Sequence, residues 1–342
     1  TYDGQQQIVL TAIVNAFILL PFIMLFSPAG YLSDRYPKPR VIRWTAFASI
    51  GATLLITLCY YQGWFWAAFA LTLVLATQSA FYSPAKYGYI RELVGAENLA
   101  AANGVVQATT ITAILMGTFV FSGAFEILLP NYGNFGTGDI IALIAPIGWA
   151  LVALAALQWL VSLRLVLTRT ERTQRDFVME HYLKLHYLRE NLALLGERRP
   201  ILLSILGLAT FWGVSQVMLA AFPAFAKARL DINNTVVIQG ILACAGVGIM
   251  LGSLVAGRIS RNYIETGLIP VGAVIITGII ALLPTLDSTF TMALAFLAVG
   301  MGGGFFIIPL SSLIQFHARA SQLGTVLAGN NWVQNVTMLV FL

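Results

Sequence analysis

The chain has 342 residues, of which 58% are hydrophobic and only 10% are charged, and its formal net charge is +5. A soluble globular domain has roughly 25% charged residues, so this composition excludes a chain that exposes most of its surface to water. The mean hydropathy of +0.83 instead indicates a protein that is embedded in a membrane.

Apolar stretches close to or above the ~18 residues that cross a bilayer recur along the whole sequence. They predict an all-α polytopic membrane protein with ten spans, at about residues 8–33, 41–61, 65–85, 99–127, 140–163, 201–225, 235–256, 266–283, 290–316 and 321–342.

The basic residues fall almost entirely on one side of the predicted membrane. Of the 19 Lys and Arg residues, only Lys227 and Arg229 lie on the opposite side. Cytoplasmic loops carry the excess of Lys and Arg, so we expect the basic loops of this multi-pass protein to be cytoplasmic. The net charge is thereby explained by topology, and nucleic acid is not expected as a partner.

The sequence repeats itself at an offset of 227 residues. The segment Gly-Tyr-Leu-Ser-Asp-Arg-Tyr at 30–36 returns as Gly-Arg-Ile-Ser-Arg-Asn-Tyr at 257–263, and residues 103–110 return in part at 330–337. Two matches that share one offset indicate a duplicated half. A duplicated, very apolar chain is typical of transporters built from parallel repeats.

The repeat divides the chain into an N-terminal half, residues 1–168, and a C-terminal half, residues 200–342. Both ends fall on the outer side in this topology, so we expect one further span before Thr1 and one after Leu342, which makes twelve. Residues 169–199 between the halves place apolar side chains at helical spacing among charges. We expect an amphipathic helix on the cytoplasmic membrane surface there, and a merely solvated linker helix is the alternative.

No residue pattern points to a metal or a cofactor. Cys59 and Cys244 lie inside apolar stretches and are interpreted as free, buried thiols, and the three His residues lack a convincing metal-ligand spacing. The glycine-rich run from Gly300 to Gly304 has no strand before it. We interpret it as a site of close helix packing or flexibility, and not as a phosphate loop.

Two sets of residues resemble known transporters. The segment Gly-Tyr-Leu-Ser-Asp-Arg-Tyr-Pro-Lys-Pro-Arg at 30–40 resembles the loop signature after the second helix of the major facilitator superfamily. A narrower resemblance, to the bacterial lysophospholipid transporter branch of that superfamily, rests on residues 83–88, 99–104, 308–310 and 326–335.

The resemblance implies a major facilitator fold of two pseudo-symmetric helical halves, of which helices 2–6 and 7–11 are present here. It implies a transporter, not an enzyme, that moves lysophospholipids such as lysophosphatidylethanolamine from the outer to the inner leaflet of the bacterial inner membrane during phospholipid remodelling. It also implies a fused or associated acyltransferase, which would follow Leu342 if fused. We expect a monomer surrounded by membrane lipids.

Charged residues of the motif loops are candidates for contacts that close the cytoplasmic side. The resemblance implies that Asp34 meets the start of helix 11, which should begin near Ser321, and Arg319 one turn before that start is a second possible partner. In the repeat, Arg261 replaces Asp34. The repeat-related partner of Arg261 is the start of the helix at about residues 99–127, and Glu97 and Glu92 precede that start. We therefore predict a second contact with reversed charges, between Arg261 and Glu97 or Glu92. The alternative is that these are solvated loop charges. The candidate gating residues are Asp34, Arg35, Arg40, Glu92, Glu97, Arg261 and Arg319.

Amide side chains recur inside the apolar stretches, where unpaired polar groups are costly, so we expect them to face the interior or a hydrated cavity. Asn103 and Gln107 share a helix face, because they are four residues apart. Asn330 and Gln334 repeat this pair, and the interface between the halves is where such transporters bind cargo. Hydrogen bonding between helices is the alternative. The candidate substrate-binding residues are Asn15, Gln78, Lys86, Asn103, Gln107, Gln216, Gln239, Gln315, Asn330 and Gln334.

Lys86 is the candidate contact for a charged substrate group. It lies near the inner end of its span, among Phe81, Tyr82, Tyr87 and Tyr89. A lysine ammonium is a suitable partner for a phosphate group. The alternative is an anchor whose ammonium reaches the lipid headgroups.

Acidic residues lie outside the middle of the predicted spans. Glu126 is 27 residues beyond Leu99, or roughly 40 Å along a helix, and is therefore at the outer surface. Proton-coupled exporters usually need a carboxyl group in mid-membrane. We therefore expect a facilitator that works by alternating access, and a proton-coupled exporter of drugs or small amphiphiles is the alternative.

Overall fold

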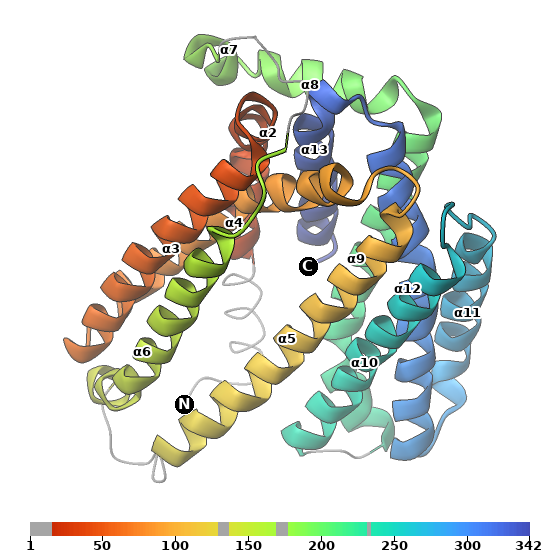
Figure 1. Cartoon of the computed structure of the whole chain (residues 1–342). Coiled ribbons are helices and arrows are strands. Elements are labelled where there is room, and N and C mark those ends of the chain that lie inside the picture. The colour runs from red at the N-terminus through yellow and green to blue at the C-terminus, as the bar shows by residue number, and fades with distance from the viewer. Residues whose placement is uncertain (1–15, 129–136, 169–176, 231–233) are drawn as a thin grey trace. The chain divides into compact units, whose positions relative to one another are not determined.

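The computed structural model describes residues 16–128, 137–168, 177–230 and 234–342 (Figure 1). All regular structure in these ranges is helical, which confirms the predicted all-α class. The helices are Ala16–Met24, α2 (Phe26–Arg35), α3 (Lys38–Tyr61), α4 (Phe65–Val94), α5 (Leu99–Leu128), α6 (Thr137–Ser162), α7 (Met179–Leu183), α8 (His186–Gly196), α9 (Arg199–Leu230), α10 (Thr235–Ile259), α11 (Leu268–Leu282), α12 (Thr289–His317) and α13 (Leu323–Val340), with short 3-10 turns at Leu283–Thr285 and Ala320–Gln322.

Eight helices, α3 to α6 and α9 to α12, are long and apolar enough to cross a membrane, so the chain is a multi-pass membrane protein. Helix Ala16–Met24 and α2 meet at a bend of 52°, a geometry that fits either a ninth, broken span or a re-entrant loop. The tenth predicted stretch also folds as a helix, α13, but it is less apolar because it carries four amide side chains, Asn330, Asn331, Gln334 and Asn335. Among the described residues, eight or nine spans are therefore identified by length and composition, and the span predicted over α13 stays a prediction.

Local sequence explains several helix ends. Residue Gly95 follows α4 with a φ of 72°, in the left-handed region that glycine adopts without steric strain. The side chain of Asn234 accepts a hydrogen bond from the Val236 amide at 2.9 Å, which caps the start of α10. These ends set the lengths of two helices that carry candidate residues.

The described residues form two compact units that do not follow the sequence halves. The first unit comprises the described parts of 1–89 and 118–195, together with 319–335. The second unit comprises 90–117, the described parts of 196–318, and 336–342. The first part of α5 is therefore packed with helices of the C-terminal half, and most of α13 with helices of the N-terminal half. The predicted division at 169–199 stays a prediction.

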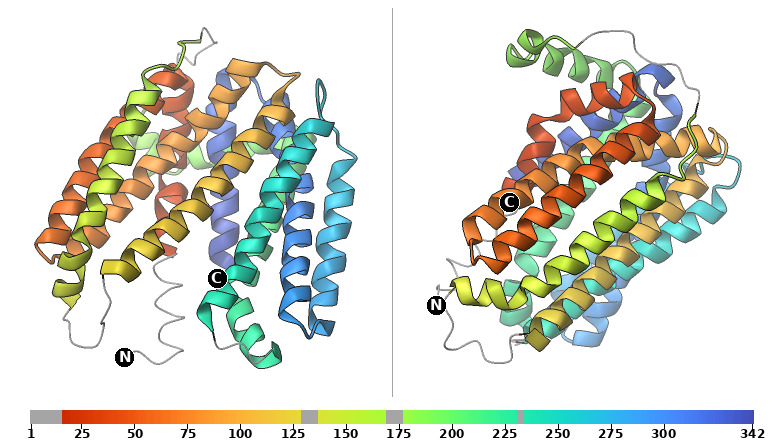
Figure 2. Two further views of the ribbon diagram at one scale, coloured as in Figure 1. Left: turned by 60° about the horizontal axis from the view of Figure 1, so that its bottom comes forward. Right: turned by 60° about the vertical axis from the view of Figure 1, so that its left-hand side comes forward.

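In the first unit, α3 and α6 run side by side, as both views of Figure 2 show. Gly148 of α6 lies so close to Thr57 of α3 that an added Cβ atom would approach the Thr57 hydroxyl to 2.5 Å. Arg43 of α3 donates hydrogen bonds to the Ser162 and Leu165 carbonyls at 3.1 and 2.7 Å, which satisfies backbone groups at the end of α6. Small side chains and one arginine thus fix this helix pair.

In the second unit, α12 packs against α10, α11 and α9. Its glycine-rich run lies at these contacts, because a Cβ atom on Gly300 or Gly304 would meet the backbone of α10. The predicted role of this run in close helix packing is confirmed. Phe222 of α9 and Phe296 of α12 pack in the buried core, with ring centroids 4.5 Å apart.

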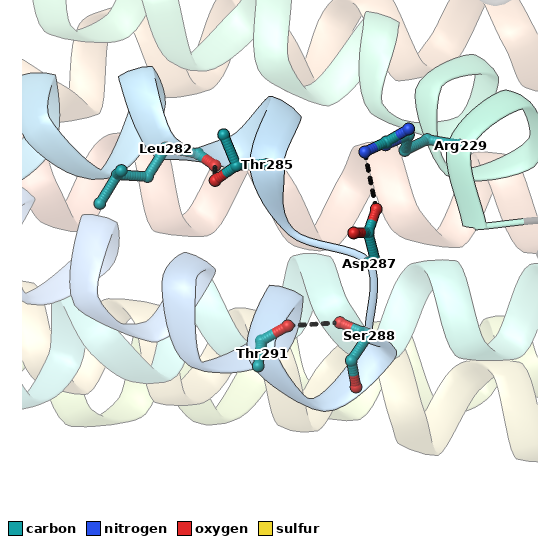
Figure 3. A network of polar contacts seen from close by, with 6 residues as sticks. All are labelled: Arg229, Leu282, Thr285, Asp287, Ser288 and Thr291. Atoms are coloured by element: carbon teal, nitrogen blue, oxygen red, sulfur yellow. Dashed lines mark hydrogen bonds and ion pairs between the residues drawn. The ribbon is translucent and has the colours of Figure 1, made fainter.

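An exposed ion pair joins the end of α9 to the turn between α11 and α12 (Figure 3). Arg229 lies 2.7 Å from Asp287, and the two side chains are 48% and 70% exposed. The hydroxyl groups of Thr285 and Thr291 each donate to a carbonyl three residues earlier, which closes the flanking turns. The ion pair lies in water-accessible surroundings, so it contributes little to stability.

Residues 177–195 of the linker, which include α7 and α8 up to Leu195, belong to the first unit. The Tyr182 hydroxyl donates to the Met24 carbonyl at 2.8 Å, at the bend between helix Ala16–Met24 and α2. Leu195 is buried beside Gly329 of α13. The amphipathic linker helix therefore packs on the protein, and its location on the membrane surface stays a prediction.

Both cysteines are free thiols, as predicted. Cys59 is buried, whereas Cys244 is only half-buried. The prediction of full burial was wrong for Cys244, because an apolar stretch does not specify which side of a membrane helix is covered by protein.

Candidate functional site

The first part of the candidate site is the contact between α2 and the start of α13 in the first unit. Asp34 is buried at the end of α2, and its carboxylate accepts hydrogen bonds from the amides of Gly324 and Thr325 at 2.6 and 2.9 Å. The Thr325 hydroxyl donates a third bond at 2.7 Å. A carboxylate at a helix N-terminus satisfies backbone donors that have no partner within the helix.

Close backbone approach and a second charge support this contact. A Cβ atom on Gly30 would lie 2.8 Å from the Thr325 Cα atom, so only glycine allows α2 to approach α13 here. The buried ammonium of Lys38 interacts electrostatically with Asp34. Of the two predicted partners of Asp34, the structure therefore places the helix start in contact with it.

The repeat of this contact lies in the second unit, between α10 and α5. Gly257, the counterpart of Gly30, lies against Ala101, the counterpart of Ala328, and an added Cβ atom would be 3.3 Å from the Ala101 Cα atom. Arg261 and Glu97 are both exposed and make no ion pair in the described part of the chain. The helix packing is thus repeated, while the predicted second charge contact is not formed between these two residues.

Three side chains form a buried polar network between α5 and α12 in the second unit. Asn103 donates to the Ser312 hydroxyl at 3.0 Å and accepts from the Gln315 amide at 3.0 Å. Asn103 is 3% exposed and Gln315 is 1% exposed. In this structure Asn103 of α5 and Gln315 of α12 are hydrogen-bonded to each other. This is the alternative considered for the predicted substrate residues, hydrogen bonding between helices.

A second polar cluster lies between α4 and α13 in the first unit. The Asn331 amide donates to the Ser83 hydroxyl at 2.8 Å, and the Gln334 amide donates to Asn330 at 2.9 Å. Lys86 is one turn beyond Ser83 on α4, is half-buried, and has its ammonium 4.6 Å from the centroid of the Tyr87 ring. The cluster combines one cation with neutral hydrogen-bonding groups.

The remaining candidate residues are distributed over both units. Gln78 and Arg35 are half-buried in the first unit, where Arg40 and Arg319 are exposed. In the second unit, Gln107, Gln216 and Glu92 are half-buried and Gln239 is exposed. Asn15 lies outside the described residues. Their common role in substrate binding or gating stays a prediction.

Sequence reasoning did not identify several residues that complete these contacts. Ser83, Ser312 and Thr325 provide hydroxyl groups that carry no pattern of their own. Arg91 and Arg198 donate to the Ala318 and His317 carbonyls at 2.6 and 2.8 Å, at the end of α12. The only sequence signal for the two arginines was their positive charge, because cations are favoured near the C-terminal end of a helix.

The chain is similar in sequence to curated transporters. The chain is 29% identical to the "Lysophospholipid transporter LplT" of Photorhabdus laumondii, over 99% of this chain and 78% of that protein. It is 28% identical to the protein of the same name from Yersinia pestis, over 99% of this chain and 77% of that protein.

Solved structures resemble the fold alone, because their sequence identity is low. The fucose:proton symporter FucP of E. coli superposes with a TM-score of 0.76 at 12% identity, covering 97% of this chain and 83% of that chain. A bacterial homologue of the iron transporter ferroportin gives a TM-score of 0.67 at 15% identity, covering 99% of this chain and 82% of that chain.

The model of the Major Facilitator Superfamily matches residues 4–342, which is nearly the whole chain. The similarity to lysophospholipid transporters confirms the narrower resemblance that residues 83–88 and 326–335 indicated. In the structure, the repeated sequence motif provides a pair of related contacts, in which Gly30 of α2 packs against α13 and Gly257 of α10 packs against α5. The chain therefore belongs to the Major Facilitator Superfamily.

Proposed function

We propose that this transporter is a facilitator of lysophospholipid movement, with lysophosphatidylethanolamine as its model substrate. It moves the lipid from the outer to the inner leaflet of the bacterial inner membrane by alternating access, with its basic loops in the cytoplasm. Similarity to lysophospholipid transporters along nearly the whole chain supports this substrate class. The protein acts as a monomer without an enzymatic step, and an acyltransferase consumes the lipid that it delivers.

The observation that carries the proposal is the cluster around Lys86. This residue makes no ion pair among the described residues, although it is half-buried in a membrane helix. Ser83 and Asn331 are hydrogen-bonded one turn away. An ammonium group suits the phosphate of a headgroup, and a hydroxyl and an amide can bind its other oxygen atoms.

The test is uptake of labelled lysophosphatidylethanolamine into spheroplasts that lack their own transporter. We expect Lys86→Ala to reduce uptake by at least about tenfold, because a hydrogen bond to a charged group contributes roughly 1.5–3 kcal/mol. Lys86→Arg keeps the charge and retains part of the uptake. Lys227→Ala is the matched control, because this exposed lysine is on the opposite side of the predicted membrane.

A protonophore separates the facilitator from the alternative, a proton-coupled exporter of drugs or small amphiphiles. Uptake that depends on Lys86 and is unchanged by the protonophore supports the proposal. No uptake by the unaltered protein, together with drug resistance that the protonophore abolishes, would overturn it in favour of the exporter.

A further inference from the structure

The bend between helix Ala16–Met24 and α2 coincides with a proline that removes one backbone donor. Pro28 has no amide hydrogen, so it cannot donate to the Met24 carbonyl four residues earlier, and its ring crowds that carbonyl. The helical hydrogen bonds resume at the next residue, because the Ala29 amide donates to the Leu25 carbonyl at 2.9 Å. One carbonyl at the bend thus loses its usual partner.

The repeat shows what the same stretch does without a proline. At the 227-residue offset, Met24 corresponds to Leu251 and Pro28 to Val255, both within α10. Val255 has an amide hydrogen, and α10 is one continuous helix. The bend of 52° is therefore particular to the N-terminal repeat, and Pro28 accounts for it.

The linker provides the missing donor, since the Tyr182 hydroxyl donates to the Met24 carbonyl at 2.8 Å. Membrane helices tolerate proline where a neighbouring group satisfies the carbonyl that the proline leaves unbonded. We propose that Tyr182 replaces the donor that Pro28 lacks, and that the linker thereby holds the bend and positions α2 for transport. Tyr182 is a positioning residue, because it acts through α2. Its effect on transport rests on the proposed function, whereas its bond to Met24 does not.

Further contacts join the linker to α2 on both sides of the proline. The Asn191 amide of α8 donates to the Ser27 hydroxyl at 3.2 Å. The ring of Phe177 lies 5.3 Å from that of Tyr31 and 6.0 Å from that of Tyr182, measured between centroids. These contacts keep the Tyr182 hydroxyl at the bend.

The backbone that brings Tyr182 to the bend is strained at Leu185, between α7 and α8. Its φ of 57° lies in the left-handed region, which is unfavourable for a residue with a side chain. The Leu185 side chain is 58% exposed, so its own packing does not compensate for this strain. The contacts of α7 with α2 offset it.

A double-mutant cycle tests whether the Tyr182 hydroxyl and Pro28 act on the same carbonyl. Ala29→Cys in a Cys59→Ala/Cys244→Ala background is the reporter, because Ala29 is 1% exposed and directly follows the proline. We expect Tyr182→Phe to accelerate thiol labelling about threefold, the average effect of one hydrogen bond between membrane helices. In a Pro28→Ala background, the restored amide bonds the carbonyl, so Tyr182→Phe should leave the rate unchanged.

Two further measurements control this cycle. Tyr61→Phe removes a hydroxyl that accepts a bond from Trp149 at 3.2 Å in the same unit, and should leave the labelling rate unchanged. Thermal unfolding needs no introduced cysteine and remains informative if the reporter does not fold. Tyr182→Phe should then lower the Tm only while Pro28 is present.

The strain at the α7–α8 junction gives a test of opposite sign. Leu185→Gly should slow the labelling by roughly fivefold, because glycine adopts the left-handed region without the same penalty. Leu183→Gly is the matched control, since Leu183 lies in α7 and is also exposed. It should not slow the labelling, because glycine weakens a regular helix.

Uptake of labelled lysophosphatidylethanolamine tests the positioning role. Tyr182→Phe should lower the maximal rate about threefold and leave the KM within about twofold, because the hydroxyl acts on α2 and not on the lipid. In the Pro28→Ala background, Tyr182→Phe should leave the maximal rate unchanged. A substitution that only reduced the amount of folded protein would lower the rate in both backgrounds.

Equal acceleration of labelling in both backgrounds, or none in either, would overturn the role assigned to the Tyr182 hydroxyl. A maximal rate that Tyr182→Phe leaves unchanged, alongside the expected coupling, would overturn its positioning role in transport. If the unaltered protein takes up no lysophospholipid while the labelling shows the expected coupling, the bond across the bend stands and the proposed function fails.

Discussion

Replacing Asp34 by Asn is the sharpest test of the contact between α2 and α13. The substitution keeps the size of the side chain but removes its charge and turns one acceptor atom into a donor. The Asp34 carboxylate accepts three hydrogen bonds, two from Thr325 and one from Gly324. An Asn side chain cannot accept all three, because its amide nitrogen would face an N–H or O–H group.

The expected loss follows from these bonds. One charge-assisted hydrogen bond contributes roughly 1.5–3 kcal/mol, and the remaining bonds become neutral and weaker. The attraction between a carboxylate and a helix N-terminus adds about 0.3–1 kcal/mol. Because Asp34 is buried, solvent does not screen these terms, whereas the desolvation of its carboxylate offsets part of them. We therefore expect the opening equilibrium of this contact to shift by about 3 kcal/mol, or roughly 100-fold.

Labelling of a thiol introduced by Ser33→Cys measures this opening. Ser33 is 0% exposed and precedes Asp34, and its hydroxyl has no hydrogen-bond partner, so the replacement is mild. When closing is faster than labelling, the labelling rate is proportional to the opened population. The rate should rise about 100-fold in Asp34→Asn. Thr325→Ser keeps the third bond and should stay near the parent, whereas Thr325→Val should accelerate labelling by at least about tenfold.

A rise of less than about fivefold in Asp34→Asn would refute this account, since even one lost charge-assisted bond exceeds that factor. Equal rates for Thr325→Ser and Thr325→Val would show that the hydroxyl contributes nothing.

Three further predictions concern stability and are measured by thermal unfolding in detergent. Gly104→Ala should destabilise the protein by about 1–3 kcal/mol, because the new methyl group would lie 2.5 Å from the Ser253 carbonyl oxygen; Gly117→Ala on the same helix meets nothing within 4 Å and should not destabilise. Phe296→Ala should cost about 3–5 kcal/mol because the ring is buried against Phe222, whereas Phe290→Ala, at a 70% exposed side chain, should cost much less. Arg229→Ala should change stability by less than about 1 kcal/mol, because its ion pair with Asp287 is exposed; a larger loss would mean that the network in Figure 3 is stronger than its exposure indicates.

The helices and the family were predictable because they depend on features that the sequence states directly. Long apolar stretches specify spanning helices whatever their neighbours are. The span predicted over α13 stays a prediction, because Asn330, Asn331 and their neighbouring amides lower the hydropathy of this helix. Asp34 was predictable as a contact residue from its motif, but the choice between Arg319 and the helix start required the position of α13.

Side-chain partners between helices were less predictable. The sequence indicated that Asn103 would avoid lipid, yet a cavity and a neighbouring helix satisfy that requirement equally well. In this structure the rotation of α5 directs Asn103 at Ser312 and Gln315, and its role in substrate binding stays a prediction. That rotation depends on the close approach of Gly104 to α10, which hydropathy does not encode.

The packing of the linker on the first unit changes how the connection between the halves has to be regarded. By sequence it is a tether of 31 residues, from 169 to 199. Because Tyr182 and Leu195 are held in the first unit, only Glu197 and Arg198 connect α8 to α9. The three Cα–Cα steps from Gly196 to Arg199 span at most about 11 Å. While the linker stays packed, the start of α9 therefore cannot travel far from the end of α8, and any larger displacement during transport has to release the linker first.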